Sequence, residues 1–291
     1  MTTQFNLGDI RINRIVEQEA PFFDPFKFFP TLTQDVMAQN SAWLGPRAID
    51  PKTGMLILCI QSYLVRTPHH TILIDSCVGN HKPRPARAFW NMMDSDRYQK
   101  NLAAAGVAVD DIDFVMCTHL HVDHVGWNTR LENGRWVPTF PNAKYIFADR
   151  ELSYWTERHK TDPAPVPWIQ DSVLPIVEAG RVELVKSDHA LNESVRLIPS
   201  PGHTIDHYCV HVGQEGHGAL ITGDAVHCAI QVRHPELGMM SDYDQALSGD
   251  TRRKLFSRFA DTPTLICTGH FPSPSAGRIV RRGEGYDFTS V

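Results

Sequence analysis

The stretch "CTHLHVDHVGW", residues 117–127, places four potential metal ligands within six positions. Imidazole and carboxylate side chains are costly to crowd together unless a cation or a reaction uses them. His119 and His121 are two residues apart, so an extended loop directs both imidazoles to the same side. Asp123 and His124 are adjacent and must point differently, so they could serve a second ion. The cluster therefore predicts a metal site.

Three further ligands follow short apolar segments that are predicted to be strands. His203 comes after "VRLIPSPG", Asp224 after "ALITG" and His270 after "TLICTG". The carboxyl ends of buried strands meet at one sheet edge, where α/β proteins place their sites. We expect these residues to join the cluster.

Seven ligands exceed what one tetrahedral zinc ion needs, which predicts two divalent ions with Asp224 shared between them. Two ions would lower the pKa of a shared water from about 15.7 toward 7 and so provide hydroxide at neutral pH. The net positive charge that remains would stabilise an oxyanion on a substrate. This arrangement is typical of a hydrolase.

In this order the seven residues resemble the metallo-β-lactamase-fold hydrolases. "QSYLVRTPHHTILIDSCVGN" (61–80) resembles the N-terminal hairpin of that family, and "PGHTIDH" (201–207) resembles its third motif. The resemblance implies an α/β protein with an αββα four-layer sandwich of two mixed β-sheets. It also implies that one ion binds His119, His121 and His203, that the other binds Asp123, His124 and His270, and that Asp224 bridges them.

Within that family the chain most resembles the branch of N-acyl-homoserine lactonases and methyl parathion hydrolase. "ITGDAVHCAIQV" (221–232) is similar to the segment after the bridging aspartate in methyl parathion hydrolase. In several lactonases a tyrosine near this position hydrogen-bonds the substrate carbonyl, and His227 stands there in this sequence. We expect His227 either to donate to the substrate or to support Asp224. The nearby His207 and His211 are expected to be structural, and Asp75 to be a supporting or a turn residue.

The expected reaction is the opening of a lactone or the cleavage of an ester, including a phosphotriester, by a metal-bridging hydroxide. Asp123 is a candidate proton carrier as well as a ligand. Zinc is the expected metal, although His/Asp sites also accept iron, manganese and cobalt. The resemblance to lactonases implies quorum quenching. The alternatives are an iron-dependent oxidoreductase similar to persulfide dioxygenases, a thioester hydrolase and a metal-binding module without catalysis.

Strands and helices alternate without a strict βαβ rhythm, which favours a layered α/β protein with mixed sheets. We expect a single domain over residues 1–291, with an N-terminal half at about 1–185 and a C-terminal half at about 186–291. The Phe- and Pro-rich stretch at about 20–51 is predicted to be a long ordered loop. Because this stretch is apolar, we expect it to pack against the core or a second subunit, and we predict a homodimer.

The overall composition predicts a soluble globular protein. The formal net charge of -5 gives no reason to expect nucleic acid or an anionic membrane as a partner. No apolar run approaches the roughly 18 residues of a membrane span, and the first residues lack the pattern of a signal peptide. The six dispersed cysteines are typical of reduced thiols in a cytoplasmic protein. The mostly apolar residues beside the ligands favour a small, neutral, partly hydrophobic lactone or ester.

Overall fold

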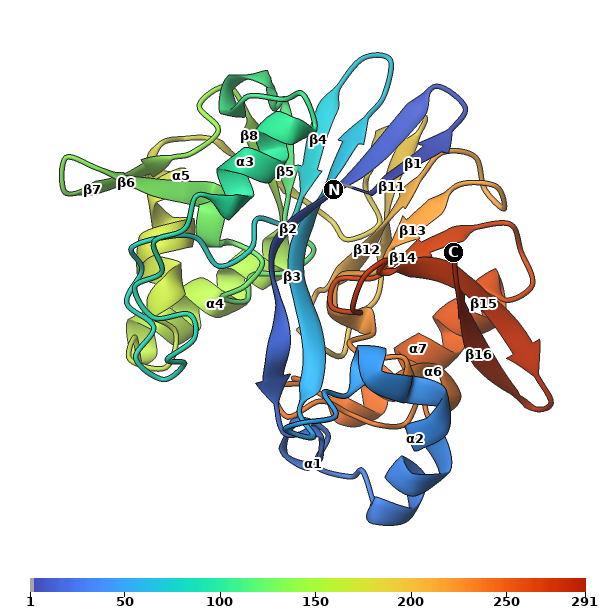
Figure 1. Cartoon of the computed structure of the whole chain (residues 1–291). Helices are drawn as coiled ribbons and strands as arrows, with labels where there is room; N and C mark the ends of the chain where they lie inside the picture. The colour runs from blue at the N-terminus through green and yellow to red at the C-terminus, as the bar shows by residue number, and fades with distance from the viewer. Residues whose placement is uncertain (1–2) are drawn as a thin grey trace. The chain divides into compact units, whose positions relative to one another are not determined.

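Two mixed β-sheets carry the ligands of the predicted site (Figure 1). The computed structural model describes residues 3–291, and over these residues it forms two seven-stranded sheets and a separate two-stranded hairpin. The strand order is β1-β2-β3-β4-β5-β8-β9 in the first sheet and β10-β11-β12-β13-β14-β15-β16 in the second. Each sheet contains both parallel and antiparallel pairs. The predicted pair of mixed sheets is therefore confirmed.

The chain folds as two compact units. The first comprises the residues up to Glu17 and Ile60–Lys186, and the second comprises Gln18–Cys59 and Ser187–Val291. The last crossing between the units, after Lys186, lies next to the boundary predicted between the two halves. The stretch 18–59 belongs with the C-terminal part of the chain. The single domain over 1–291 stays a prediction.

The first sheet is built from an antiparallel hairpin joined to a parallel set of strands. Its strands are β1 (Gln4–Leu7), β2 (Ile10–Phe23), β3 (Leu56–Arg66), β4 (Thr71–Ile74), β5 (Phe114–Met116), β8 (Lys144–Ala148) and β9 (Val182–Val185). Strands β3 and β4 pair antiparallel from Tyr63 opposite Ile74 to Arg66 opposite Thr71, which confirms the predicted hairpin. Strands β4, β5, β8 and β9 run parallel, so the loops that follow β4 and β5 leave the sheet at the same edge.

The helices and helical turns of the first unit lie in the sequence between these parallel strands. They are α3 (Arg97–Ala104), the 3₁₀ turns η1 (Val109–Asp111) and η2 (Gly126–Asn128), α4 (Asp149–Thr161), the π-helix η3 (Ile169–Val173) and α5 (Leu174–Glu178). The separate hairpin consists of β6 (Thr129–Glu132) and β7 (Arg135–Pro138). Helix α4 begins directly after β8 and buries Glu151 and Trp155. Both side chains reach the loop of residues 117–127, which we call the ligand loop.

The second sheet lies wholly within the second unit. Its strands are β10 (Ala190–Asn192), β11 (Val195–Pro199), β12 (Tyr208–Val212), β13 (Ala219–Ile221), β14 (Leu265–Cys267), β15 (Ala276–Arg282) and β16 (Gly285–Ser290). The unit's helices are α1 (Pro25–Phe28), α2 (Gln34–Ala48), the 3₁₀ turn η4 (Gly223–Ala225), α6 (Ile230–Arg233) and α7 (Gln245–Phe259). Figure 1 shows α1 and α2 lying beside α6 although they are far apart in sequence, and residues of all three share one buried cluster.

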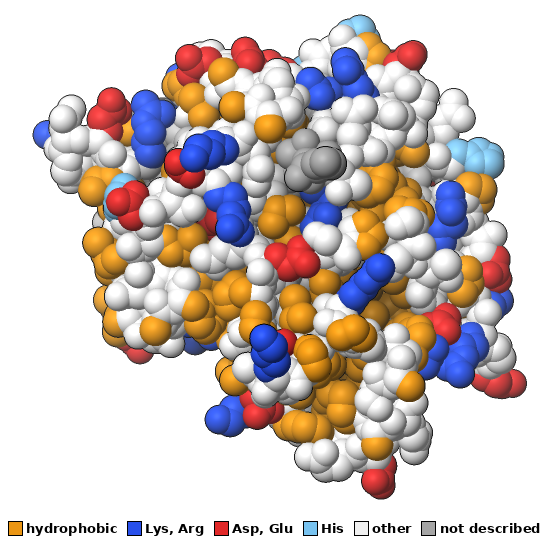
Figure 2. All heavy atoms as spheres, in the orientation of Figure 1, with side chains coloured by type: hydrophobic (Ala, Val, Ile, Leu, Met, Phe, Trp, Pro, Cys, Tyr) orange, Lys and Arg blue, Asp and Glu red, His pale blue; other side chains and the backbone are white. Residues whose placement is uncertain are grey.

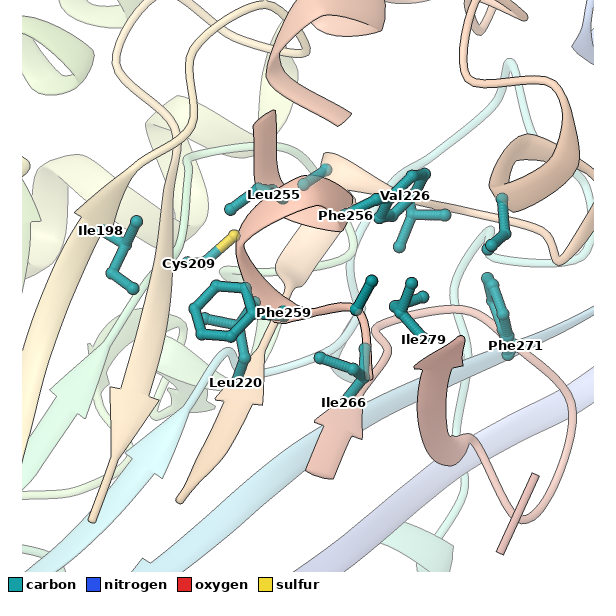
Figure 3. Close-up of a cluster of buried hydrophobic side chains, with 13 residues drawn as sticks. Ile198, Cys209, Leu220, Val226, Leu255, Phe256, Phe259, Ile266, Phe271 and Ile279 are labelled. Carbon is teal, nitrogen blue, oxygen red and sulfur yellow. The ribbon is translucent and has the colours of Figure 1, made fainter. Parts of the chain in front are cut away.

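A hydrophobic core fixes α7 against the strands that precede two of the ligands. Leu255, Phe256 and Phe259 of α7 pack on side chains from the sheet, among them Leu220 of β13 and Ile266 of β14 (Figure 3). Fully burying one such side chain stabilises the folded state by about 1.5–3 kcal/mol. The strand ends that carry the ligands therefore rest on a rigid support.

The prediction of a long loop over residues 20–51 is wrong. Strand β2 continues to Phe23, and the helices α1 and α2 occupy most of the remainder. The side chain of Asp24 caps α1 by accepting from Phe26 N and Lys27 N, and Pro25 stands in the first turn, where no backbone N–H is needed. The prolines and phenylalanines of this stretch therefore give it the composition of a loop, although its residues form capped helices.

The phenylalanines of this stretch are largely core residues, as expected. Phe28 and Phe29 are buried in a cluster with residues of β3 and of the chain around α6. Phe22, Phe23 and Phe26 are partly buried against the same cluster. The stretch 20–51 is therefore part of the second unit's core.

Candidate metal centre

In the first unit, the ligand loop is anchored by a carboxylate from the neighbouring strand. Asp75 follows β4 and Thr118 follows β5, and these parallel strands bring the two residues to the same edge. The Asp75 carboxylate accepts from the backbone N–H of Thr118 at 2.8 Å and from its hydroxyl at 2.9 Å. Its Oδ2 also lies 2.8 Å from Nδ1 of His124. Asp75 therefore has the supporting role that the sequence left open.

These contacts fix which nitrogen of each imidazole carries the hydrogen. Because a carboxylate can only accept, Nδ1 of His124 donates to Asp75 and its Nε2 keeps a lone pair. The single hydroxyl hydrogen of Thr118 goes to Asp75, so the Thr118 oxygen accepts from Nδ1 of His119, 3.1 Å away. Nε2 of His119 therefore also keeps a lone pair, and it lies 3.0 Å from Nδ1 of His121. Lone pairs held in this way are ready to bind a metal ion.

Side chains of α4 and the following segment position the backbone of the loop. Oε1 of the buried Glu151 accepts from Leu120 N at 3.2 Å, and Trp168 Nε1 donates to the Leu120 carbonyl at 2.7 Å. The rings of Trp155 and Trp168 flank His121, with centroids 5.1 and 6.4 Å from its own. The imidazole of His121 is therefore confined by aromatic side chains on the first unit.

A third buried carboxylate, Glu17, ties the end of the ligand loop to the loop after β4. It accepts from the N–H groups of Val78 at 2.9 Å and Gly79 at 3.1 Å, and from Trp127 Nε1 at 2.6 Å. Burial raises the pKa of Glu17 to about 7 although these donors oppose the shift. Gly126 fits here because a Cβ at this position would lie only 1.9 Å from the Val78 carbonyl oxygen.

In the second unit, sheet topology brings three predicted ligands together. Strand β12 is antiparallel to both β11 and β13, and β13 is parallel to β14. The carboxyl ends of β11, β13 and β14 therefore share one edge, where His203, Asp224 and His270 follow them. Nε2 of His203 lies 3.2 Å from Oδ2 of Asp224, and Nε2 of His270 lies 2.9 Å from Oδ1.

These short contacts join acceptors to acceptors. Nδ1 of His203 lies 2.7 Å from the Asp242 carboxylate, and Nδ1 of His270 lies 2.8 Å from the carbonyl oxygen of Cys59. Both Nδ1 atoms must therefore donate, so in the neutral imidazoles the Nε2 lone pairs face the Asp224 carboxylate. Only a proton or a cation between these atoms makes the arrangement favourable. Burial lowers the pKa of His203, but the carboxylates of Asp224 and Asp242 outweigh it and raise that pKa to about 9.

His227 also faces Asp224. Its Nε2 lies 3.1 Å from Oδ2, and its ring stacks on His270 and meets the edge of Phe28. Burial lowers the pKa of His227, so this imidazole tends to be neutral. Ligand atoms of Asp224, His227 and His270 all lie within 4.8 Å of one another.

His207 has a structural role, as expected. Its Nδ1 lies 2.8 Å from Ser200 Oγ, and its Nε2 accepts from the backbone N–H of Asp224 at 3.0 Å. His211, on β12, is buried, and within the described part of the chain neither of its ring nitrogens has a hydrogen-bond partner. Burial lowers the pKa of His211 to about 4, so it is a neutral core residue, as expected.

The sequence pattern of the metallo-beta-lactamase superfamily matches residues 60–270. The chain belongs to the metallo-β-lactamase superfamily. The predicted fold class is thereby confirmed, since the two mixed sheets and their helices are those of the metallo-β-lactamase fold.

Curated relatives of the chain are N-acyl homoserine lactonases. The lactonase AiiA of Bacillus thuringiensis subsp. kurstaki is 25% identical over 182 residues, which are 59% of this chain. A lactonase of Bacillus cereus is 23% identical over 185 residues. The chain spans 65% of the length of the first relative and 66% of the second.

Solved structures of two hydrolytic enzymes resemble the chain over its whole length. The hydrolase AbOPH of the beta-lactamase superfamily superimposes with a TM-score of 0.82 at 25% identity, covering 100% of this chain and 97% of its own. The dizinc quorum-quenching lactonase AidC, solved with the product N-hexanoyl-L-homoserine, gives a TM-score of 0.79 at 18% identity with the same coverage. The second likeness concerns the fold alone.

The apolar residues beside the ligands lie in the core. Val226 and Phe271 pack beneath α7, and Cys228 and Ile230 pack with Phe28. The expected apolar pocket over the ligands stays a prediction. Among the described residues, no helix has the length and apolar character to cross a membrane.

Proposed function

We propose that the chain is a metal-dependent hydrolase that opens a lactone or cleaves an ester at a binuclear metal centre. The ligands would be the seven residues that the family resemblance assigns: His119, His121 and His203 on one ion, Asp123, His124 and His270 on the other, and Asp224 on both. Asp123 would also carry the proton that the leaving group needs. The curated lactonase relatives support the reaction class.

The anchoring of the imidazoles carries this proposal. His119 and His124 of the first unit and His203 and His270 of the second each direct Nδ1 toward an acceptor, and each keeps a lone pair on Nε2. A histidine whose other nitrogen is held by a carboxylate or a carbonyl is the usual form of a metal ligand, because the contact fixes the tautomer and the ring. The donor set therefore fits divalent transition-metal ions.

The ions would supply Lewis acidity and a water acidified to a pKa near 7. Zinc is our proposed metal because the AidC lactonase is a dizinc enzyme, although nitrogen and oxygen ligands also accept iron, manganese and cobalt. The chain's own residues hold the site rigid: Asp75, Asp242 and the Cys59 carbonyl orient the rings, and Glu17 and Glu151 fix the loops around them.

The proposed substrate is a small neutral lactone or ester with a hydrophobic part. N-Acyl homoserine lactones lead the candidates, since both curated relatives act on them by name. Aryl esters and phosphotriesters remain in the same proposal, because the similarity to the hydrolase AbOPH, at 25% identity, does not narrow the substrate to a lactone. Quorum quenching would follow from lactone opening.

We further propose that the protein is a cytoplasmic homodimer. All six cysteines lie within the described residues, where they are buried and form no disulfide, in keeping with a reducing compartment. Figure 2 shows hydrophobic side chains gathered over the part of the second unit that holds α1 and α2. The partly buried residues there include Phe22, Phe26, Met37 and Trp43, and a second copy would cover them.

The proposal is tested by assaying metal-analysed protein on a panel of N-acyl homoserine lactones, other lactones, aryl esters, thioesters and phosphotriesters. We expect one of the neutral lactones or esters to be hydrolysed, and the Asp224→Ala variant to lose at least about a hundredfold in turnover. The control is His217→Ala, because His217 is exposed and is not one of the proposed metal ligands. This variant should keep full activity.

Two outcomes would contradict the proposal. Failure of dizinc protein to hydrolyse any member of the panel would remove the lactonase and esterase assignment. A chain purified with one iron per molecule, and active in oxidising a persulfide, would point to an oxidoreductase of the same fold instead.

A further inference from the structure

His227 is held in a fixed orientation toward the Asp224 carboxylate. Its ring lies parallel to that of His270, with 5.5 Å between centroids and an interplanar angle of 7°. Phe28 meets it edge-on at 5.6 Å, and its backbone N–H donates to Gln231 Oε1 at 2.7 Å. The side chain is 1% exposed. Within residues 3–291, the polar group that its ring faces is Oδ2 of Asp224, 3.1 Å from Nε2.

His227 differs from its neighbours His203 and His270 at the opposite nitrogen. Their Nδ1 atoms face acceptors, which forces the hydrogen onto Nδ1 and the lone pair onto Nε2. Nδ1 of His227 is buried and has no hydrogen-bond partner among residues 3–291. The tautomer with hydrogen on Nε2 therefore gains a bond to a carboxylate, whereas the other tautomer would bury an unsatisfied N–H and oppose two acceptors.

We propose that His227 is a positioning residue that donates its Nε2–H to Oδ2 of Asp224 and so holds the carboxylate that both metal ions are to share. This inference rests on the proposed function for the role of Asp224. A carboxylate on a flexible side chain loses torsional freedom when it bridges two ions, and a fixed donor removes part of that cost beforehand. Outer contacts of this kind typically contribute 10- to 100-fold in metal affinity.

His227 could instead be a metal ligand, because its Nε2 lies within ligand distance of Asp224 and His270. Two features of the second unit argue for the donor. The anchored Nδ1 of a metal-ligating histidine is missing at His227 alone among the imidazoles around Asp224. The rings of Phe28, His203 and His270 pack around His227, and its Nε2 already has the Asp224 carboxylate as a partner.

Three variants separate hydrogen bonding from packing and from ligation. His227→Phe keeps an aromatic ring between Phe28 and His270 but has no donor. His227→Gln loses the ring but keeps an N–H at a similar reach. His227→Ala removes both. The readout is the affinity for the first and the second zinc ion, measured on the full chain by competition with a chromophoric chelator, with circular dichroism of the metal-free proteins to verify folding.

We expect His227→Phe and His227→Ala to lower the affinity for the second zinc ion by 10- to 100-fold. The affinity of His227→Gln for that ion should stay within about threefold of that of the original chain. Turnover of fully zinc-loaded protein should then change less than zinc affinity does. Unchanged zinc affinity in His227→Phe would overturn the inference. So would a loss in His227→Gln as large as that in His227→Phe, because glutamine replaces the donor but not a ligand or a ring.

Failure of this inference is distinguishable from failure of the proposed function. If the original chain binds two zinc ions but hydrolyses nothing, the hydrolase assignment fails, and the zinc affinities of the variants still decide the role of His227. If the chain hydrolyses a lactone and the variants bind zinc as it does, only the role of His227 is refuted.

Discussion

Replacing Asp75 by alanine removes one acceptor that serves three donors of the ligand loop. The carboxylate accepts from the Thr118 N–H at 2.8 Å, from the Thr118 hydroxyl at 2.9 Å and from His124 Nδ1 at 2.8 Å. Asp75 is 4% exposed, so water does not readily take its place. A buried donor that loses its acceptor costs about 1–3 kcal/mol. Allowing for local relaxation, we expect the free energy of unfolding to fall by about 3–5 kcal/mol.

The same change should loosen the metal ligands of the first unit. Without Asp75, neither His124 nor the Thr118–His119 pair has its hydrogen position fixed, and zinc affinity should fall about 10- to 100-fold. Asp113→Ala is a matched control on the same pair of strands, because Asp113 is exposed and accepts a single bond from Thr71 N at 2.8 Å. Its loss should cost less than about 1 kcal/mol and leave zinc affinity unchanged.

Denaturant unfolding of the metal-free proteins and zinc competition of the folded ones measure both effects. If Asp75→Ala is no less stable than Asp113→Ala, the anchoring of the ligand loop has been misread. If it is less stable but binds zinc as tightly as the original chain, Asp75 stabilises the fold without orienting the ligands.

Other predictions test the surroundings of the site. Gly126→Ala would put a Cβ 1.9 Å from the Val78 carbonyl oxygen, so we expect it to lower the melting temperature sharply. An unchanged melting curve would show that the loops containing Gly126 and Val78 can move apart. Burial raises the pKa of Glu17 from 4.5 to about 7, so its unfolded form ionises first and stability should fall by up to about 3 kcal/mol as pH rises from 4.5 to 7. Glu17→Gln should flatten that decline, and an equally steep decline in the variant would assign it to other groups. Static light scattering at micromolar concentration should give the mass of two chains, and the mass of one would refute the dimer.

The ligands were predictable because each stands directly after a short apolar strand. That pattern is visible in the sequence itself, where "ALITG" precedes Asp224 and "TLICTG" precedes His270. Parallel neighbours in a sheet end at the same edge, so the two residues were expected to lie close together. In the structure, His203 and His270 both contact Asp224 within the second unit. The division of the seven ligands between two ions stays a proposal.

The residues that support the ligands were hidden from the sequence. Asp242 lies 39 residues after His203, and Glu17 lies 110 residues before Trp127, so nothing local marks these contacts. The helices α1 and α2 were missed for a different reason. Their N-cap residues, Asp24 and Thr33, lie among phenylalanines and prolines, and this composition is typical of a loop. The two N-cap residues were the sequence signal that would have predicted the helices.

Zinc titration of metal-free protein, with hydrolysis followed at each step, tests the binuclear site most directly. Activity on the best substrate of the panel should rise until two zinc ions are bound per chain, because seven ligands exceed the needs of one ion. Asp224→Ala should take up fewer ions at the same free zinc concentration and recover part of its activity in excess zinc. Full activity at one zinc ion per chain, unchanged by the second, would contradict the account.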